Sequence, residues 1–339
     1  MANRDILAIG TSAGGVEALL ALAKAFPREF PAAVLVTIHL SSHFRSILDE
    51  ILTRSGPLPA RFVGHGDPLR PGEIHLAPPD RHLLVEDDRI VLGYGPRENN
   101  SRPAIDPMLR SVGACCGSRT IGVVLTGTLS DGASGLWAVG RCGGITVVQD
   151  PGDAAFPEMP ANVLNRIKPD HVVRLAAMPQ LLASLASQPA GAPMPVPESV
   201  KFEIGVAKGR QSSIEEMDRL SRRSPLACPD CHGVMWEIDE GELIRYRCHV
   251  GHAYTAELMS LALDENLRQG LGSALRALEE RRQLARKLEK QAERNGRPLL
   301  AASWSRRAEE SESELKIIRD AVRRLDDIAA RDERKVAAE

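Results

Sequence analysis

The sequence predicts an α/β protein: a doubly wound, mainly parallel sheet with helices on both faces, followed by a small zinc ribbon and an α-helical hairpin. Over residues 1–175, short β-branched runs alternate with helical patterns, and this alternation is typical of a parallel sheet. A Cys/His cluster and two long amphipathic patterns follow this region and account for the two additions.

Four apolar runs are expected to form buried strands, because they are continuous and end at glycine or polar residues. These runs are Ile6–Ile9, Ala33–Ile38, Ile121–Leu125 and Ile145–Val148, with helical patterns at about 15–26, 44–54, 105–115 and 132–141. The segment 72–92 interrupts this rhythm, and we expect it to form a β-hairpin region with antiparallel strands beside the sheet.

Shifts in composition divide the chain into four expected segments. These are an α/β domain at 1–187, a Pro-rich linker at 188–223, a zinc-ribbon-like module at 224–255 and a helical hairpin tail at 256–339. Closely spaced prolines in the linker disfavour helix and sheet and favour an extended chain. In the tail, Asn295-Gly-Arg-Pro298 is typical of one helix ending and the next beginning.

The charge balance and the apolar content limit the classes of partner. Lys and Arg total 43 and Asp and Glu total 45, and this formal net charge of −2 argues against a nucleic-acid binder. Aromatic residues make up 4% of the chain, too few for a base-stacking surface. No signal peptide is visible, and no stretch approaches the roughly 20 apolar residues of a membrane span. We therefore expect a cytoplasmic protein with no nucleic-acid partner and no membrane insertion.

A candidate nucleophile, Ser12, follows the first strand in Gly10-Thr-Ser-Ala-Gly14 and precedes a helical pattern. The G-x-S-x-G spacing is typical of a nucleophile elbow, in which small neighbours allow a sharp turn and expose the hydroxyl. The alternative is a Gly-rich loop that holds a phosphate or dinucleotide. The spacing is not G-x-G-x-x-G and no P-loop lysine follows, but the short motif alone does not decide between the two.

A histidine and an aspartate stand at the ends of two other expected strands. His39 ends the second strand and Asp131 follows the third, and the carboxyl ends of neighbouring parallel strands share one crevice. His39 is therefore a candidate base and Asp131 a candidate acid that fixes its tautomer. Each also has a simpler interpretation, His39 as a loop-capping side chain and Asp131 as a helix N-cap.

The ordered motifs around these residues resemble the catalytic domain of the chemotaxis protein-glutamate methylesterase family, CheB, over residues 1–175. The matching pieces are Ile9–Gly15, the strand-end His39, Pro71–His82, Arg102–Ser111, Leu125–Ala133 and Gln149–Pro160. Their order Ser, His, Asp differs from the Ser, Asp, His order of ordinary α/β-hydrolases.

The resemblance implies that Ser12 attacks a glutamyl methyl ester on a chemoreceptor helix, with His39 as general base and then general acid. Asp131 would orient His39, methanol would leave, and water would release the glutamate. The family also deamidates receptor glutamines, so glutaminase activity is a further expectation, and no cofactor is needed for catalysis. Our candidates for the oxyanion hole are the backbone N–H groups of Ala13 and Thr128.

Two departures from the family pattern affect these expectations. The family has Gly-Met-Gly where this chain has Gly127-Thr-Leu129, so one glycine is missing from the loop before the catalytic Asp. The family's enzymes carry an N-terminal phospho-receiver domain, whereas this chain starts at the catalytic strand. We therefore expect basal activity that does not depend on phosphodonors.

The Cys/His segment predicts a structural zinc site. Cys228 and Cys231 form a C-P-x-C-x-G knuckle, and Cys248 with His252 supplies a second pair. His249 is an alternative fourth ligand and His232 a weaker one, while incidental thiols in a small module are the simpler interpretation. Because the catalytic domain has its own core, we expect chelation to unfold 224–255 and to leave esterase activity largely intact.

An alternative function is a catalytically weak docking module in a receptor signalling complex. A nucleotide-binding α/β protein is a third hypothesis, but it lacks an acidic ribose ligand at the end of the second strand. The expected partners are the cytoplasmic helices of methyl-accepting chemoreceptors, with a sensor kinase or a methyltransferase as further candidates. We expect the tail, whose charge is mixed, to dock on one of these partners.

Overall fold

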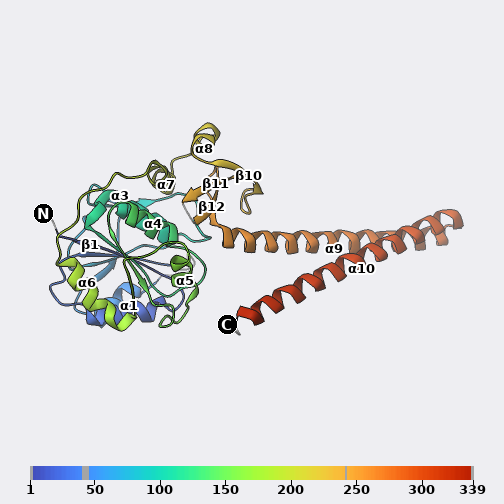
Figure 1. Ribbon diagram of the computed structural model, residues 1–339. Coiled ribbons are helices and arrows are strands. Elements are labelled where there is room, and N and C mark those ends of the chain that lie inside the picture. Colours follow the sequence, from blue (N-terminus) through green and yellow to red (C-terminus); the bar gives the residue numbers. More distant parts are fainter. Residues whose placement is uncertain (1–2, 40–45, 241–242, 337–339) are drawn as a thin grey trace. The chain divides into compact units, whose positions relative to one another are not determined.

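The computed structural model describes residues 3–39, 46–240 and 243–336, and the chain forms two compact units, Met1–Met259 and Ser260–Glu339. The predicted fold class is confirmed: a parallel sheet with helices on both faces, a four-stranded ribbon and a helical hairpin (Figure 1). No helix among the described residues is both long enough and apolar enough to cross a bilayer.

The main sheet has seven parallel strands in the order β3-β4-β2-β1-β7-β8-β9. Their bounds are β1 (Ile6–Thr11), β2 (Ala33–Ile38), β3 (Ala60–Phe62), β4 (Ile74–Leu76), β7 (Thr120–Val124), β8 (Ile145–Gln149) and β9 (His171–Val173). β1 lies between β2 and β7, with Ile9 opposite Val36 and Val123. The strand order reverses beside β1, so a crevice opens at the carboxyl ends of these central strands.

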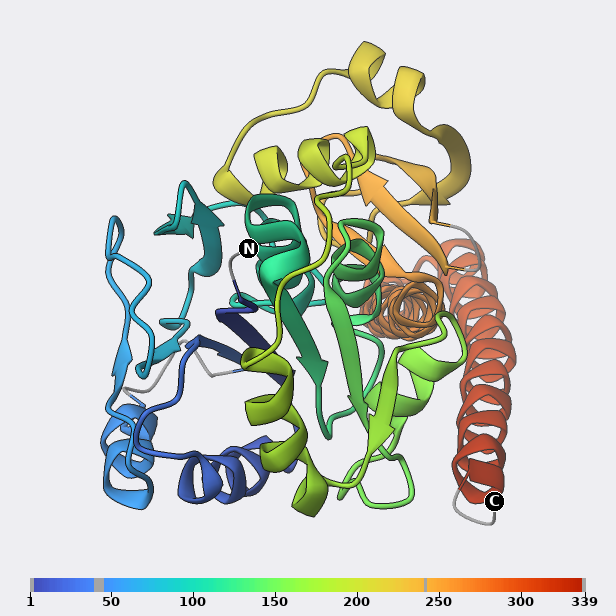
Figure 2. The same ribbon diagram turned by 60° about the vertical axis from the view of Figure 1, so that its left-hand side comes forward.

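Helices cover both faces of this sheet, each face over its own apolar core (Figures 1 and 2). One face carries α1 (Gly15–Ala25), α2 (Leu48–Ser55) and α6 (Met178–Ala186), and the other carries α3 (Ile105–Cys116), α4 (Ala133–Arg141) and α5 (Glu158–Leu164). Short 3-10 turns at Gly117–Arg119 and Leu175–Ala177 complete the connections. The expected helix at 44–54 is described from Leu48 onward, and residues 44–45 lie outside the described residues.

The irregular segment at 72–92 divides between two structures. β5 (His82–Glu86) and β6 (Arg89–Gly93) form the expected antiparallel hairpin, turning at Asp87 and Asp88 with positive φ. The expectation was wrong for 74–76, which pairs in parallel with β2 as β4 of the main sheet. Three consecutive buried residues there resemble a strand covered on both faces, as in the rest of the parallel sheet.

The segment 188–223 is not a simple linker, contrary to the expectation. Residues 190–197 form no helix or strand, but α7 (Glu198–Lys208) and α8 (Ile214–Leu220) follow them. α7 lies beside α3 (Figures 1 and 2). Phe202, Val206 and Met217 form a small core with Trp236 of the ribbon, so these helices join the ribbon to the α/β domain.

The ribbon is a four-stranded antiparallel sheet in chain order. Its strands are β10 (Arg222–Ala227), β11 (Val234–Glu240), β12 (Leu243–Cys248) and β13 (Ala253–Thr255). It clusters with the α/β domain in the first compact unit rather than forming a unit of its own.

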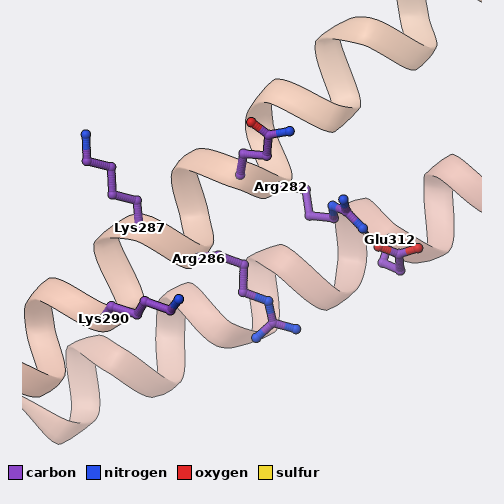
Figure 3. A pocket seen from close by; sticks show the side chains of 6 residues that line it. Arg282, Arg286, Lys287, Lys290 and Glu312 are labelled. Atoms are coloured by element: carbon purple, nitrogen blue, oxygen red, sulfur yellow. Dashed lines mark hydrogen bonds and ion pairs between the residues drawn. The ribbon is translucent and has the colours of Figure 1, made fainter.

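The second unit is an antiparallel helical hairpin, made of α9 (Ala256–Arg294) from Ser260 onward and of α10 (Pro298–Val336). Alanines line much of the seam, with Ala285, Ala292, Ala301 and Ala308 all buried. Figure 3 shows a groove on this hairpin lined by Arg282, Gln283, Arg286, Lys287, Lys290 and Glu312, in which Arg282 turns toward Glu312. Apart from that ion pair the groove is mostly basic.

Candidate active site and metal centre

The structure brings Ser12, His39 and Asp131 together at the carboxyl ends of β1, β2 and β7. Ser12 Oγ lies 3.0 Å from His39 Nδ1, and His39 Nε2 lies 2.7 Å from Asp131 Oδ2. Because an ionised carboxylate only accepts, Nε2 carries the proton and Nδ1 is free to accept from the serine. The ring nitrogens are therefore used in the reverse order to chymotrypsin-type proteases, with the same division of roles.

Ser12 is held by the turn that follows β1. Its N–H donates to Thr126 O at 3.1 Å, and the Thr11 hydroxyl donates to the same carbonyl at 2.9 Å. Gly14 has φ +71, a left-handed conformation that glycine adopts without strain, and it caps α1. A Cβ at Gly10 would lie 2.1 Å from the side chain of Ile105, so only glycine lets α3 approach the end of β1.

Asp131 is fully buried and accepts hydrogen bonds on both oxygens. Oδ2 accepts from His39 and from the N–H of Ile105 at 2.6 Å, while Oδ1 accepts from Asn99 Nδ2 at 3.0 Å and from the N–H of Asp106 at 3.1 Å. Burial by itself raises the pKa of Asp131, but the hydrogen bond and charge of His39 and the other donors hold it below its usual range. Asp131 is therefore suited to remain an anion beside His39.

A second buried carboxyl, Asp106, lies beside the first. Its Oδ1 accepts from the N–H groups of Gly132 and Gly135 at 3.0 and 2.7 Å, and its Oδ2 accepts from Asn99 Nδ2 at 3.0 Å. Burial and then the charge of Asp131 raise the pKa of Asp106 to about 7. The roles of Asp106 and Asn99 could not be predicted, since nothing in one sequence indicates that these residues meet Asp131.

The candidate oxyanion donors lie on the two loops that flank Ser12. Neither Ala13 nor Thr128 donates its backbone N–H to an acceptor within the described part of the chain. Leu129, which stands where the family has glycine, keeps the left-handed backbone with φ +67. Its N–H donates to Glu158 Oε2 at 3.1 Å and its carbonyl accepts from Asn162 at 2.7 Å, so α5 supports the loop despite the missing glycine.

The four predicted metal ligands Cys228, Cys231, Cys248 and His252 lie together, with their ligand atoms within 4.8 Å of one another. Two tight turns present them: the N–H of Cys228 donates to Gly233 O at 2.8 Å, and the N–H of Gly251 donates to Cys248 O at 2.9 Å. The alternative ligands His249 and His232 are not members of this group.

The spacing of these atoms fits a tetrahedral zinc ion. Cys231 Sγ and Cys248 Sγ are 3.7 Å apart, and His252 Nδ1 lies 3.6 Å from the sulfurs of Cys228 and Cys248. Tetrahedral bonds of about 2.3 Å to sulfur and about 2.0 Å to nitrogen give separations of about 3.8 and 3.6 Å. Asp230 lies 4.0 Å from His252 Nε2, where it suits the outer partner that ligating histidines usually have.

Comparison with known proteins identifies the α/β domain. The CheB methylesterase family model matches residues 7–182, more than half of the 339 residues. The crystal structure of the Thermotoga maritima CheB methylesterase catalytic domain matches with a TM-score of 0.52 and 29% identity, over 55% of this chain and 100% of that chain.

Several relatives are named protein-glutamate methylesterase/protein-glutamine glutaminase. The Methanosarcina mazei protein numbered 2 is 34% identical over 183 residues, 52% of this chain and 50% of that protein, and the Geobacter metallireducens protein numbered 4 is 35% identical over 189 residues, 55% of this chain and 54% of that protein. A putative member from Leptospira interrogans is 31% identical over 184 residues, 54% of this chain and 95% of that protein. This chain thus matches about half the length of the first two relatives and nearly all of the third. The chain belongs to the CheB methylesterase family.

Proposed function

We propose that this chain hydrolyses glutamyl methyl esters on the cytoplasmic helices of methyl-accepting chemoreceptors and releases methanol. The observation that carries this proposal is the hydrogen-bonded relay from Ser12 through His39 to the buried Asp131, at the strand ends of a CheB-type domain. The names of the relatives supply the substrate class. The receptor as substrate and the cytoplasmic location are part of the proposal and rest on the resemblance to the CheB family.

In the proposed reaction, Ser12 Oγ attacks the ester carbonyl while His39 Nδ1 takes its proton. The N–H groups of Ala13 and Thr128, which donate to no acceptor among the described residues, would stabilise the oxyanion, and Asp131 stabilises the imidazolium that forms. The imidazolium returns the proton to methoxide, and methanol leaves. A water molecule, deprotonated by His39, then hydrolyses the acyl-serine and releases the glutamate.

A second candidate activity is the deamidation of receptor glutamines, because the names of the relatives also include protein-glutamine glutaminase. An amide passes through the same acyl-serine, with ammonia in place of methanol as the leaving group. The same relay serves both reactions, because His39 protonates either leaving group.

The test of the catalytic roles is methanol release from a methylated receptor fragment. We expect Ser12→Ala and His39→Ala each to lower kcat by at least about 10³-fold, with no further loss in the double variant, because the residues act as a unit. Substitution of Ser55, which lies on α2, by Ala is a matched control. Near-wild-type turnover by Ser12→Ala would falsify the mechanism.

The Cys/His cluster is proposed to hold one structural zinc ion per chain. Three thiolates and one imidazole nitrogen close a tetrahedral shell, so the ion would support the fold and would take no part in the ester chemistry. Elemental analysis of protein purified without chelator is expected to find about one zinc per chain. Protein that contains no metal would refute the assignment, and so would a zinc content that Cys231→Ser leaves unchanged.

A further inference from the structure

The loop 98–101, which positions the candidate catalytic acid Asp131, is held by contacts with the ribbon. We propose that the ribbon, which carries the proposed metal site, supports catalysis by fixing Asn99, a positioning residue for Asp131. This inference rests on the catalytic role proposed for Asp131 and extends it to the loop 98–101 and to strands β12 and β13.

Asn99 joins the two buried carboxylates. Its Nδ2 donates to Asp131 Oδ1 and to Asp106 Oδ2, both at 3.0 Å, so the two amide hydrogens serve the two acids. The residue is 3% exposed and has φ +50, a left-handed conformation that asparagine tolerates better than most residues. By donating a hydrogen bond to Asp131, Asn99 favours its ionised form even though a second buried acid lies beside it.

The ribbon fixes the backbone of Asn99. Its N–H donates to Ala253 O on β13 at 3.0 Å, and Glu98 pairs with Ala253 in a parallel bridge. Glu98 and Ser101 exchange both backbone hydrogen bonds, at 3.2 and 2.9 Å, so the loop is closed into a rigid turn. The position of Asn99 against Asp131 therefore depends on where β13 lies.

Six buried charges tie the same loop to the ribbon a second time. This Glu98 cluster comprises Glu98, Arg110 of α3, Glu203 of α7, Glu240 of β11, and Arg245 and Arg247 of β12, and each side chain is 1% exposed or less. Glu98 Oε1 accepts from Arg247 Nη2 at 3.0 Å, and Oε2 accepts from Arg245 Nη2 at 3.3 Å and from Arg110. Three acids balance three guanidinium groups, and withdrawal of β12 would remove two of the three guanidinium groups that pair with Glu98 and leave it with Arg110 alone.

The proposed metal site adjoins this cluster. Arg247 Nη1 donates to the carbonyl of Gly251 at 2.6 Å, and Gly251 lies in the turn between the ligands Cys248 and His252. A Cβ at Gly251 would lie 2.9 Å from Pro96, three residues before Asn99. An ion that fixes this turn would therefore also fix the positions of Arg247, Ala253 and the segment 96–99.

A further contact reaches the loop on the other side of Asp131. Ser130 Oγ donates to Glu257 Oε2 at 3.4 Å, and Glu257 lies in the first turn after β13. Arg166, which follows α5, pairs with the same carboxylate. Ser130, the residue directly before Asp131, thus contacts the segment that continues the ribbon.

These contacts reverse the expectation that chelation leaves the esterase intact. If the ribbon only added stability, its loss would lower the amount of folded enzyme and leave the pH dependence of the remaining activity unchanged. If it positions Asn99, loosening it lets Asp131 and Asp106 take up a proton at higher pH, because two adjacent buried carboxyls share one proton readily. The activity would then be lost at a higher pH on the acid side of the pH profile.

The first test replaces Asn99 and leaves the ribbon in place. The rate of Ser12 labelling by a fluorophosphonate, which needs an activated serine and no receptor, is followed from about pH 5.5 to about pH 9, a range that includes the raised pKa of about 7 of Asp106. We expect Asn99→Ala to slow labelling on the order of 10²-fold at the acid end, with a much smaller loss at the alkaline end and an acid limb moved to higher pH. Asn100→Ala is the matched control, since Asn100 has φ +61 in the same loop but is exposed.

The second test acts from the ribbon side on the full chain. Arg247→Lys keeps the charge but cannot reach Glu98, Glu203 and Gly251 together, so we expect a smaller shift of the acid limb in the same direction. Arg222→Lys, at an exposed position on β10, is the control. Removing the metal with a chelator is expected to reproduce the Asn99→Ala profile, and adding zinc is expected to restore the original one.

The outcomes separate the inference from the proposed function. If wild-type Ser12 is labelled but Asn99→Ala has the wild-type pH profile, the positioning role is refuted whatever the receptor assay gives. Should the chelated protein unfold, Asn99→Ala still decides, because it leaves the ribbon and its metal untouched. Labelling without methanol release from receptor fragments would refute the substrate alone, and wild-type Ser12 that is not labelled at all would refute both.

Discussion

Replacing Asp131 by asparagine keeps the size of the side chain and removes its charge. The carboxylate accepts from His39 and the N–H of Ile105 on one oxygen, and from Asn99 and the N–H of Asp106 on the other. An amide nitrogen faces two donors in either orientation. We expect it to turn toward Asn99, whose Oδ1 accepts from none of the described residues and can rotate to receive it.

In that orientation His39 keeps its tautomer but loses its anionic partner. The donor and acceptor atoms are 2.7 Å apart, which places the charge centres of an imidazolium and a carboxylate about 4 Å from each other. At an effective dielectric constant of about 20, that pair is worth about 4 kcal/mol. Since each 1.4 kcal/mol is about tenfold in rate, Asp131→Asn is expected to lower kcat by about 10³-fold.

The assay is methanol release at pH 8 with saturating methylated receptor fragment, alongside the thermal midpoint of unfolding. Asp170→Asn is the matched control, because Asp170 accepts from Thr146 at the far edge of the sheet and touches no part of the relay. A loss of less than tenfold in kcat by a folded Asp131→Asn enzyme would contradict the assigned role of the charge.

Two further predictions concern the residues around the acid. Leu129→Gly removes a left-handed strain of about 1–2 kcal/mol and adds roughly 0.5–1 kcal/mol of unfolded-chain entropy. Urea unfolding is therefore expected to show between about 0 and about 1.5 kcal/mol of added stability, and a clear destabilisation would count against the strain. The pKa of Asp106 is raised to about 7 in the folded protein, whereas in the unfolded chain this carboxyl loses its proton above about pH 4. The folded protein therefore binds one more proton between these values, and its stability falls as the pH rises from about 4 to about 7. Asp106→Asn cannot titrate, and its free energy of unfolding, measured by urea across that range, is expected to lack this decline; an unchanged slope would show that the raised pKa is wrong.

The parallel sheet was predictable because its strands are buried on both faces. The runs at 6–9, 33–38, 121–125 and 145–148 are continuous and apolar, and each became a central strand within a residue or two of the expected bounds. Parallel strands bring their carboxyl ends to one edge, so three residues at strand ends were expected to meet there. The distances between Ser12, His39 and Asp131 agree with that expectation.

The supports of the site were not predictable, because they come from elements far apart in the chain. Asn99 stands in a loop of polar residues, and its two acceptors lie on α3 and after β7. The proline density at 188–197 led us to extend a linker to residue 223, although the prolines stop at Pro197 and the pattern of α7 begins at once. Glu203, on that helix, therefore passed unnoticed as a partner of Arg247.

Strand β12 indicates why the ribbon is not a detachable module. Its side chains alternate between the two faces as in any strand, but here the arginines face inward. Arg245 and Arg247 are fully buried, whereas Ile244, directly before Arg245, is 45% exposed. An isolated ribbon of this sequence would present two guanidinium groups on the face that a small sheet must cover, and burying them without acids is strongly unfavourable. Glu240 of β11 partners Arg245 within the ribbon, but the other acids on this face, Glu98 of the loop 98–101 and Glu203 of α7, come from outside it. The pattern of this strand is therefore matched to the α/β domain, and in our proposal the zinc ion that would stabilise the ribbon would also help to hold Asn99 beside Asp131.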